Sequence, residues 1–138
     1  MPFHLTVVTP EGEAFDKHVD GVVLPGTEGE FGVLAAHEPF MTGLKTGTVQ
    51  IRTGEETLHA AIGRGFAEVH AAEVSVLVRS CEFAHEIDRS RAEIARDRAL
   101  AQLQEMRASA EGEAAYQALQ ETYARAVARV TASDKFKP

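Results

Sequence analysis

Apolar and polar residues alternate with a period of two along the first 84 residues of the chain. The clearest runs are Phe3, Leu5 and Val7; Val49 and Ile51; and Val74, Val76 and Val78. Residues spaced in this way share one face of a strand. Turn residues separate the runs, and residues 53–56 and 71–73 have the pattern of hairpin tips. Short strands between regular turns predict an antiparallel sandwich or barrel.

The period changes at residue 88, and apolar positions then recur at gaps of three and four. One stripe is Ala92, Ala95, Ala99, Leu103, Met106 and Ala110; a second is Tyr116, Leu119, Tyr123, Ala126 and Val130. Each stripe predicts an amphipathic helix. Residues 109–112 suit a helix stop, with Gly112 in the left-handed conformation.

The predicted fold is therefore an N-terminal antiparallel β-sandwich, residues 1–85, followed by a C-terminal two-helix antiparallel hairpin, residues 86–138. The first stripe is mostly alanine, which buries little apolar area. Isolated helices of this length are marginal in water. We expect the hairpin to lean on another surface and to be able to detach from it.

Charge is unevenly divided along the 138 residues. Residues 1–85 carry a net charge of −7, whereas residues 86–138 are neutral overall. This argues against nucleic acid as a partner of the sandwich and for a basic protein surface. Solvated acidic loops are an equally good explanation of the charge alone.

Three observations concern the compartment. Cys81 is the only cysteine, which fits a reducing environment. Residues 1–4 lack the basic start and apolar core of a secretion signal. No apolar run approaches the roughly 18 residues needed to span a membrane, so we expect any membrane association to come through a partner.

Motifs of enzymes and metal sites are incomplete. The zincin-like start His37-Glu38 has Met41 where histidine is required, and Gly63-Arg64-Gly65 has Glu68 in place of the third glycine of a dinucleotide motif. The six histidines are scattered singly. The sequence predicts neither catalysis nor a metal site.

Charged residues at the start of the helical part are the best functional signal. Asp88 is placed to cap the first helix, and Arg91 and Arg98 follow on the same face. Arg125 and Arg129 are neighbours on the second helix. Four converging guanidinium groups would need an anion to offset their repulsion, and a nucleotide would serve. The alternative, equally supported by spacing, is that these arginines are solvated or pair with Glu86, Glu121 or Asp97.

The chain resembles the epsilon subunit of F-type ATP synthases over its whole length. The residues that carry the resemblance are 23–26, 28–34 and 37–40, then 65–69 with 74–77, and Ile-Asp-x-x-Arg-Ala at 87–92. Arg64 departs from the pattern, since a glycine is common at that position.

The resemblance implies a ten-stranded sandwich and a non-catalytic subunit of the central stalk that couples proton transport to ATP synthesis. The implied partners are the gamma subunit, the membrane rotor ring and, when the helices extend and block hydrolysis, the catalytic hexamer. Glu30 and His37 would face the rotor ring. ATP is implied as an optional regulatory ligand, with no obligatory cofactor; its implied contacts are Glu82, Ile87, Asp88, Arg91, Ala92, Arg98, Arg125 and Arg129.

The implied location is the cytoplasmic face of a bacterial inner membrane, because the absence of a transit peptide favours a bacterial over a mitochondrial protein; a plastid-encoded homologue would also lack one. The alternative function is a free-standing ATP-sensing module that shares this architecture without joining a rotary complex.

Overall fold

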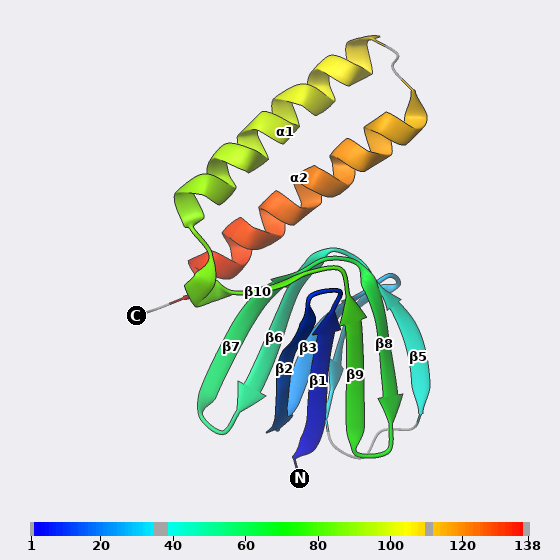
Figure 1. The fold of residues 1–138 in the computed structure, drawn as a ribbon, viewed down its shortest axis with the longest axis vertical. Helices are drawn as coiled ribbons and strands as arrows, with labels where there is room; N and C mark the ends of the chain where they lie inside the picture. The colour runs from blue at the N-terminus through cyan, green and yellow to red at the C-terminus, as the bar shows by residue number, and fades with distance from the viewer. Residues whose placement is uncertain (1, 35–38, 110–111, 137–138) are drawn as a thin grey trace.

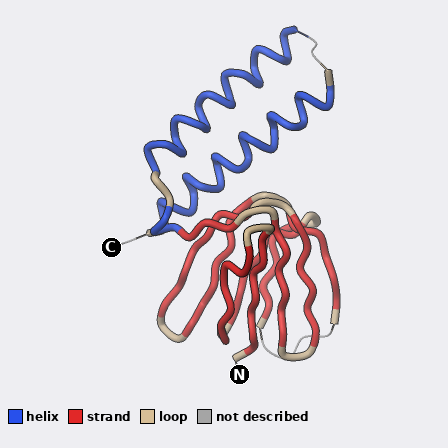
Figure 2. The backbone as a smooth tube through the Cα atoms, viewed as in Figure 1, coloured by secondary structure: helices blue, strands red, loops and turns tan. Residues whose placement is uncertain are grey.

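The computed structural model describes residues 2–34, 39–109 and 112–136, and the side chains of residues 107–109 are not described. The N-terminal part of the chain forms β-strands, and two long helices follow it (Figures 1 and 2). In chain order the elements are β1 (Phe3–Thr9), β2 (Gly12–Val19), β3 (Gly21–Gly26), β4 (Gly29–Val33), β5 (Phe40–Leu44), β6 (Gly47–Thr53), β7 (Glu56–Ile62), β8 (Gly65–His70), β9 (Glu73–Val78), β10 (Cys81–Phe83), the 3₁₀ turn η1 (Ala84–Glu86), α1 (Arg89–Ser109) and α2 (Glu113–Asp134).

The strands form one continuous sheet that wraps around a single core. Its order is β10-β7-β6-β3-β5-β8-β9-β1-β2, with β4 paired to β3. The predicted antiparallel sandwich is confirmed, with one difference: β1 and β9 run parallel, with Leu5 opposite Val74. A parallel pair is possible here because seven strands separate the two in the chain, whereas a tight hairpin would force the antiparallel direction.

Inward-facing residues of the alternating runs make the core. Leu5, Leu24 and Ile51 are almost completely buried, and the ring of Phe15 lies 5.9 Å from that of Phe83. Both predicted hairpin tips are present. Gly54 turns between β6 and β7 at φ 61°, and Ala71 turns between β8 and β9 at φ 54°.

The two helices pack against each other along the predicted stripes. Ala92, Ala99 and Leu103 of α1 are buried, as are Ala126 and Val130 of α2. The expectation for Gly112 is wrong: its φ is −58°, and it stands as the N-cap residue of α2. Because α2 begins at the next residue, Gly112 starts a helix and so needs no left-handed conformation.

The hairpin rests on the sandwich through α2, and α1 lies on the far side of α2 (Figure 1). The contact, called the seam below, is a small cluster of buried Ala61, Ala128 and Ala132 with half-buried Ile87 packed against it. The hydroxyl of Thr46 adds hydrogen bonds to the carboxylate of Glu121, at 2.7 and 2.6 Å. The seam therefore buries little apolar area.

Candidate functional site

The start of α1 is built around Asp88, as predicted. The backbone N–H of Arg91 donates to Oδ1 of Asp88 at 3.2 Å, and the N–H of Ala92 donates to the Asp88 carbonyl at 3.1 Å. A side-chain cap of this kind satisfies an N–H group that the first turn leaves without a partner. The Asp88 carboxylate is thus already used by the helix.

A polar pocket of about 200 Å³ lies between α2 and the edge of the sandwich. Its lining residues are Ala61, Ile62, Ser80, Glu82, Arg125 and Arg129. Within it, Nε of Arg129 lies 2.8 Å from Oε1 of Glu82, and Nη2 of Arg129 donates to Oε2 of Glu82 at 3.4 Å. Nε of Arg129 is buried without well-aligned hydrogen-bond geometry, so the close approach is best described as an ion pair.

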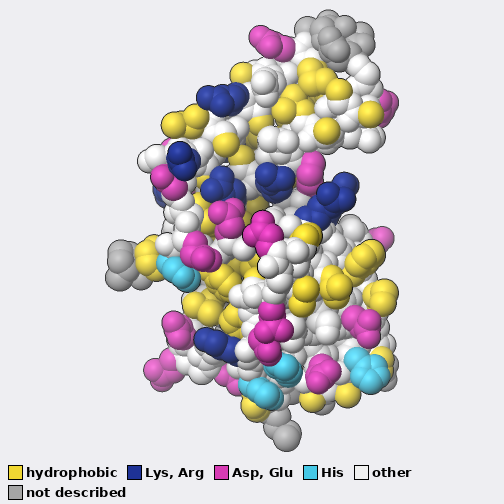
Figure 3. All heavy atoms as spheres, in the orientation of Figure 1, with side chains coloured by type: hydrophobic (Ala, Val, Ile, Leu, Met, Phe, Trp, Pro, Cys, Tyr) yellow, Lys and Arg dark blue, Asp and Glu magenta, His cyan; other side chains and the backbone are white. Residues whose placement is uncertain are grey.

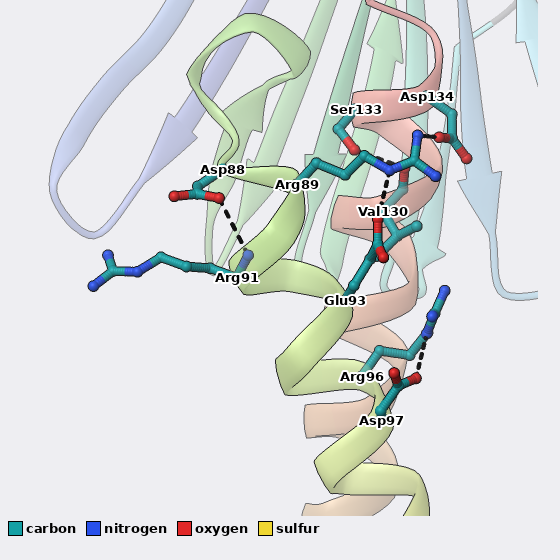
Figure 4. Close-up of polar contacts among 9 residues, drawn as sticks. All are labelled: Asp88, Arg89, Arg91, Glu93, Arg96, Asp97, Val130, Ser133 and Asp134. Atoms are coloured by element: carbon teal, nitrogen blue, oxygen red, sulfur yellow. Dashed lines mark hydrogen bonds and ion pairs between the residues drawn. The ribbon is translucent and has the colours of Figure 1, made fainter.

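The four arginines predicted to converge divide into two pairs in this structure. Arg125 and Arg129 line the pocket, whereas Arg91 and Arg98 are exposed on α1 and do not line it. Figure 4 shows the Arg91 side chain pointing away from α2. As a result, the pocket holds two guanidinium groups and one carboxylate.

Local ion pairs engage other arginines of α1. Arg89 pairs with Glu93 at 2.7 Å and with Asp134 at the end of α2, and Arg96 pairs with Asp97 at 3.0 Å (Figure 4). The alternative partners considered for the predicted four do not hold them. Glu121 accepts from Thr46, Asp97 pairs with Arg96, and Glu86 accepts from the N–H of Phe83.

The pocket is suited to a small anionic group. Across the described residues, the guanidinium of Arg125 has no ion pair or hydrogen bond, so it is free to donate. A volume of about 200 Å³ is below the roughly 300–1,000 Å³ of pockets for drug-sized ligands. It can accept phosphate groups, but not a whole nucleotide.

Two further predicted nucleotide contacts, Ala92 and Ile87, are packed against other parts of the protein. Ala92 is fully buried in the helical hairpin, and Ile87 packs against the seam. Glu30 is exposed on β4 and lines a pocket with Thr131 and Lys135 of α2. His37, its predicted companion at the rotor ring, lies outside the described residues.

An apolar outer face of the sheet was missed by the sequence reasoning. The register places Val8, Leu77, Phe66 and Gly43 in one row across β1, β9, β8 and β5. Phe66 is 59% exposed and Leu77 is 50% exposed. A groove of about 570 Å³ runs over this row, with Arg64 and Arg79 in its lining. Large apolar residues at outward positions beside the buried Ala67 and Val76 were the available signal.

Space-filling Figure 3 shows Lys and Arg side chains gathered where the hairpin meets the sandwich, with acidic side chains beside them.

Cys81, next to Glu82 on β10, is not a reactive group: burial, together with Glu86 and Glu82, raises the pKa of its thiol to about 11. Within residues 2–34, 39–109 and 112–136, no three His, Cys, Asp or Glu side chains are grouped to bind a metal. The helices in that part of the chain are not apolar enough to cross a membrane.

Comparison with known proteins gives consistent matches. Residues 2–84 match the family described as ATP synthase, Delta/Epsilon chain, beta-sandwich domain. The chain is 44% identical to the ATP synthase epsilon chain of Syntrophobacter fumaroxidans over 131 residues, 95% of each chain. It is 38% identical to that of Cyanothece sp. over 133 residues, 96% of each chain.

A solved structure shares the fold. The chain superimposes on one chain of the Euglena gracilis mitochondrial ATP synthase, described as OSCP/F1/c-ring in rotational state 1, with a TM-score of 0.80. The match covers 96% of this chain and 81% of the other at 23% sequence identity. At that identity the likeness establishes the arrangement of strands and helices.

Proposed function

The chain belongs to the epsilon-chain family of ATP synthases, stalk subunits that carry no catalytic site, and we propose that its helical hairpin regulates ATP hydrolysis by the assembled enzyme. Family membership extends over 95% of both chains in the Syntrophobacter comparison. That coverage favours a subunit of the rotary complex over a free-standing ATP-sensing module, since sandwich and hairpin match together.

The thinness of the seam is the observation that carries this proposal. Beside the Thr46–Glu121 hydrogen bonds and the Glu82–Arg129 ion pair, the apolar part of the contact consists of three alanines and one isoleucine. A buried alanine contributes far less than a buried leucine. A hairpin held so weakly can exchange between a docked and a released state. We infer that the released helices extend along the stalk and obstruct the catalytic subunits.

Removing residues 88–138 is expected to raise the rate of ATP hydrolysis by the assembled enzyme, while ATP synthesis persists. The truncation takes away the obstructing helices and leaves the sandwich, whose core contains no residue of the hairpin. The measurement compares hydrolysis in membranes carrying full-length or truncated subunit at low ATP. Equal rates, with equal amounts of assembled enzyme, would show that this hairpin does not inhibit.

We also propose that the apolar outer face docks on the gamma subunit of the stalk, and that Glu30 and His37 lie toward the rotor ring. Exposed apolar patches of this kind on a soluble domain mark interaction sites. Arg64 and Arg79 line the groove, which suits a partner segment with apolar and acidic residues. The protein would then sit peripherally at the cytoplasmic face of a bacterial inner membrane, held there by the complex.

Replacing Phe66 with serine is expected to weaken binding to the gamma subunit by about 2 kcal/mol, roughly 30-fold, as for an aromatic anchor of an interface. Ile94 on α1, 58% exposed against 59% for Phe66, provides a matched control, and Ile94→Ser should bind normally. Titration calorimetry with purified gamma subunit is the measurement. Normal binding by Phe66→Ser would show that the gamma subunit docks on a different surface of the sandwich.

ATP is proposed as a regulatory ligand of the docked hairpin, with Arg125 and Arg129 receiving its phosphates. Support comes from the Arg125 guanidinium, which has no partner within the part of the chain that the structure describes, and from the pocket between α2 and β10. Arg91 and Arg98 would have to turn inward to join them. A ligand that binds only the docked hairpin shifts the balance toward it, by about 2.7 kcal/mol at 100 times its dissociation constant.

A further inference from the structure

His59 lies on the face of the sheet that α2 covers. It is on β7 two residues before Ala61, so both side chains point to the same side of the strand. Ala61 belongs to the seam, and His59 is half-buried beside it, opposite Gln50 of β6. An imidazole is therefore placed in the contact between the hairpin and the sandwich.

Lys135 occupies the corresponding place on the helix side. Lys135 is the exposed C-cap residue of α2 and keeps a right-handed helical conformation. Its spacing from Ala128 and Ala132, seven and three residues, therefore places it on the continuation of their face. Two cavities at this contact, of about 500 and 210 Å³, are each lined by both His59 and Lys135. The lysine and the histidine thus line the same two cavities, next to the place where the alanines of α2 meet Ala61.

Few groups are available to offset a second positive charge here. The other titratable groups that line the two cavities are Glu30 of β4, Glu56 of β7 and His85 of η1, all exposed to solvent. The last carbonyls of α2 do not substitute for a carboxylate. Those of Ala132 and Ser133 already accept hydrogen bonds from the backbone N–H groups of Lys135 and Phe136.

We propose that His59 makes the seam a proton-sensitive latch: with His59 neutral the hairpin stays docked, and protonation of His59 against Lys135 releases it. The latch needs no partner subunit, because both residues belong to this chain. Its regulatory consequence, release of an inhibitory hairpin on acidification, rests on the proposed function.

The direction of the pH effect follows from linkage. Burial, and then the charge of Lys135, lower the pKa of His59 from its ordinary value of 6.5. The released state therefore binds the proton more tightly than the docked state. Docking is at full strength above about pH 6.5 and declines as the pH falls from there toward the lower pKa of the docked state. One pH unit below 6.5, the docking equilibrium constant falls by at most about tenfold.

The test is a distance measurement on the full-length protein, without partners or ATP. Donor and acceptor dyes are attached at Glu55→Cys, in the turn between β6 and β7, and Glu105→Cys, on the exposed side of α1, in a Cys81→Ser background. Between pH 8 and pH 5.5 the released fraction should rise up to about tenfold relative to the docked fraction. His59→Gln, which stays neutral, should show no such rise, while His85→Gln should behave like the parent.

A released fraction that does not change with pH, or the same rise in His59→Gln, would overturn the latch. If His59→Gln fails to dock at any pH, Lys135→Gln decides instead. It keeps the titrating imidazole but removes the facing charge, so the pH effect should shrink, and an undiminished effect would reject the proposed pair. None of these outcomes depends on ATP hydrolysis, so the latch and the inhibitory function can fail separately.

Discussion

Replacing Gly65 with alanine is expected to lower the free energy of unfolding by about 3 kcal/mol or more. Gly65 begins β8 and lies opposite Val78 of β9 and Leu44 of β5. A Cβ at this position would lie 1.8 Å from the carbonyl oxygen of Leu77 and 2.8 Å from its carbonyl carbon. Both atoms belong to the backbone, so relief requires β8 and β9 to separate and breaks the ladder between them.

Gly32 is the matched control for this substitution. It is also a strand glycine, but a Cβ there would meet its nearest atoms at 3.9 Å, so Gly32→Ala should leave stability within about 0.5 kcal/mol of the parent. Urea unfolding followed by circular dichroism measures both variants. A Gly65→Ala protein as stable as Gly32→Ala would mean that β8 and β9 are not in this close contact.

Arg129→Ala should weaken ATP binding by about 1.5–3 kcal/mol, and Glu82→Gln should strengthen it. The first change removes a charge-assisted donor to phosphate. Glu82→Gln frees the Arg129 guanidinium, because in the parent protein the Glu82 carboxylate forms an ion pair with Nε of Arg129 at 2.8 Å. The opposite signs matter, since a general loss of hairpin stability would move both variants the same way.

Calorimetry and thermal shift at millimolar ATP provide the measurement. Arg96→Ala is the control, because Arg96 pairs with its neighbour Asp97 on α1 and does not line the pocket; it should bind ATP like the parent. Absence of heat and of any shift in the parent protein would reject the site and leave Arg125 and Arg129 as structural charges.

Local patterns predicted the fold well because they reflect burial directly. Leu5 and Val7 alternate with half-exposed neighbours because one face of β1 meets the core. The change of period near Asp88 correctly predicted the start of α1, because the first turn of a helix needs an acceptor such as the Asp88 carboxylate close by in the sequence. Neither feature depends on how distant segments come together.

What depended on distant segments was not predictable in the same way. The parallel pairing of β1 with β9 and the ion pair between Glu82 and Arg129 join residues far apart in the chain. Helical spacing placed Arg91 and Arg98 on one face of α1, but it did not say which way that face points. Likewise, the apolar row through Phe66 and Leu77 appears only once the strand register is known.

The position of the seam gives the hairpin mechanical leverage. Among the described residues, α2 makes the main helical contacts with the sandwich, mostly through its C-terminal half, and the far ends of both helices project beyond the sheet (Figure 1). The 21 residues of α1 make an arm about 30 Å long. A turn of about 20° at Ile87 and Asp88 would carry the tip of such an arm about 10 Å. Small changes among a few side chains at the base are thereby amplified into a displacement that a neighbouring subunit can detect.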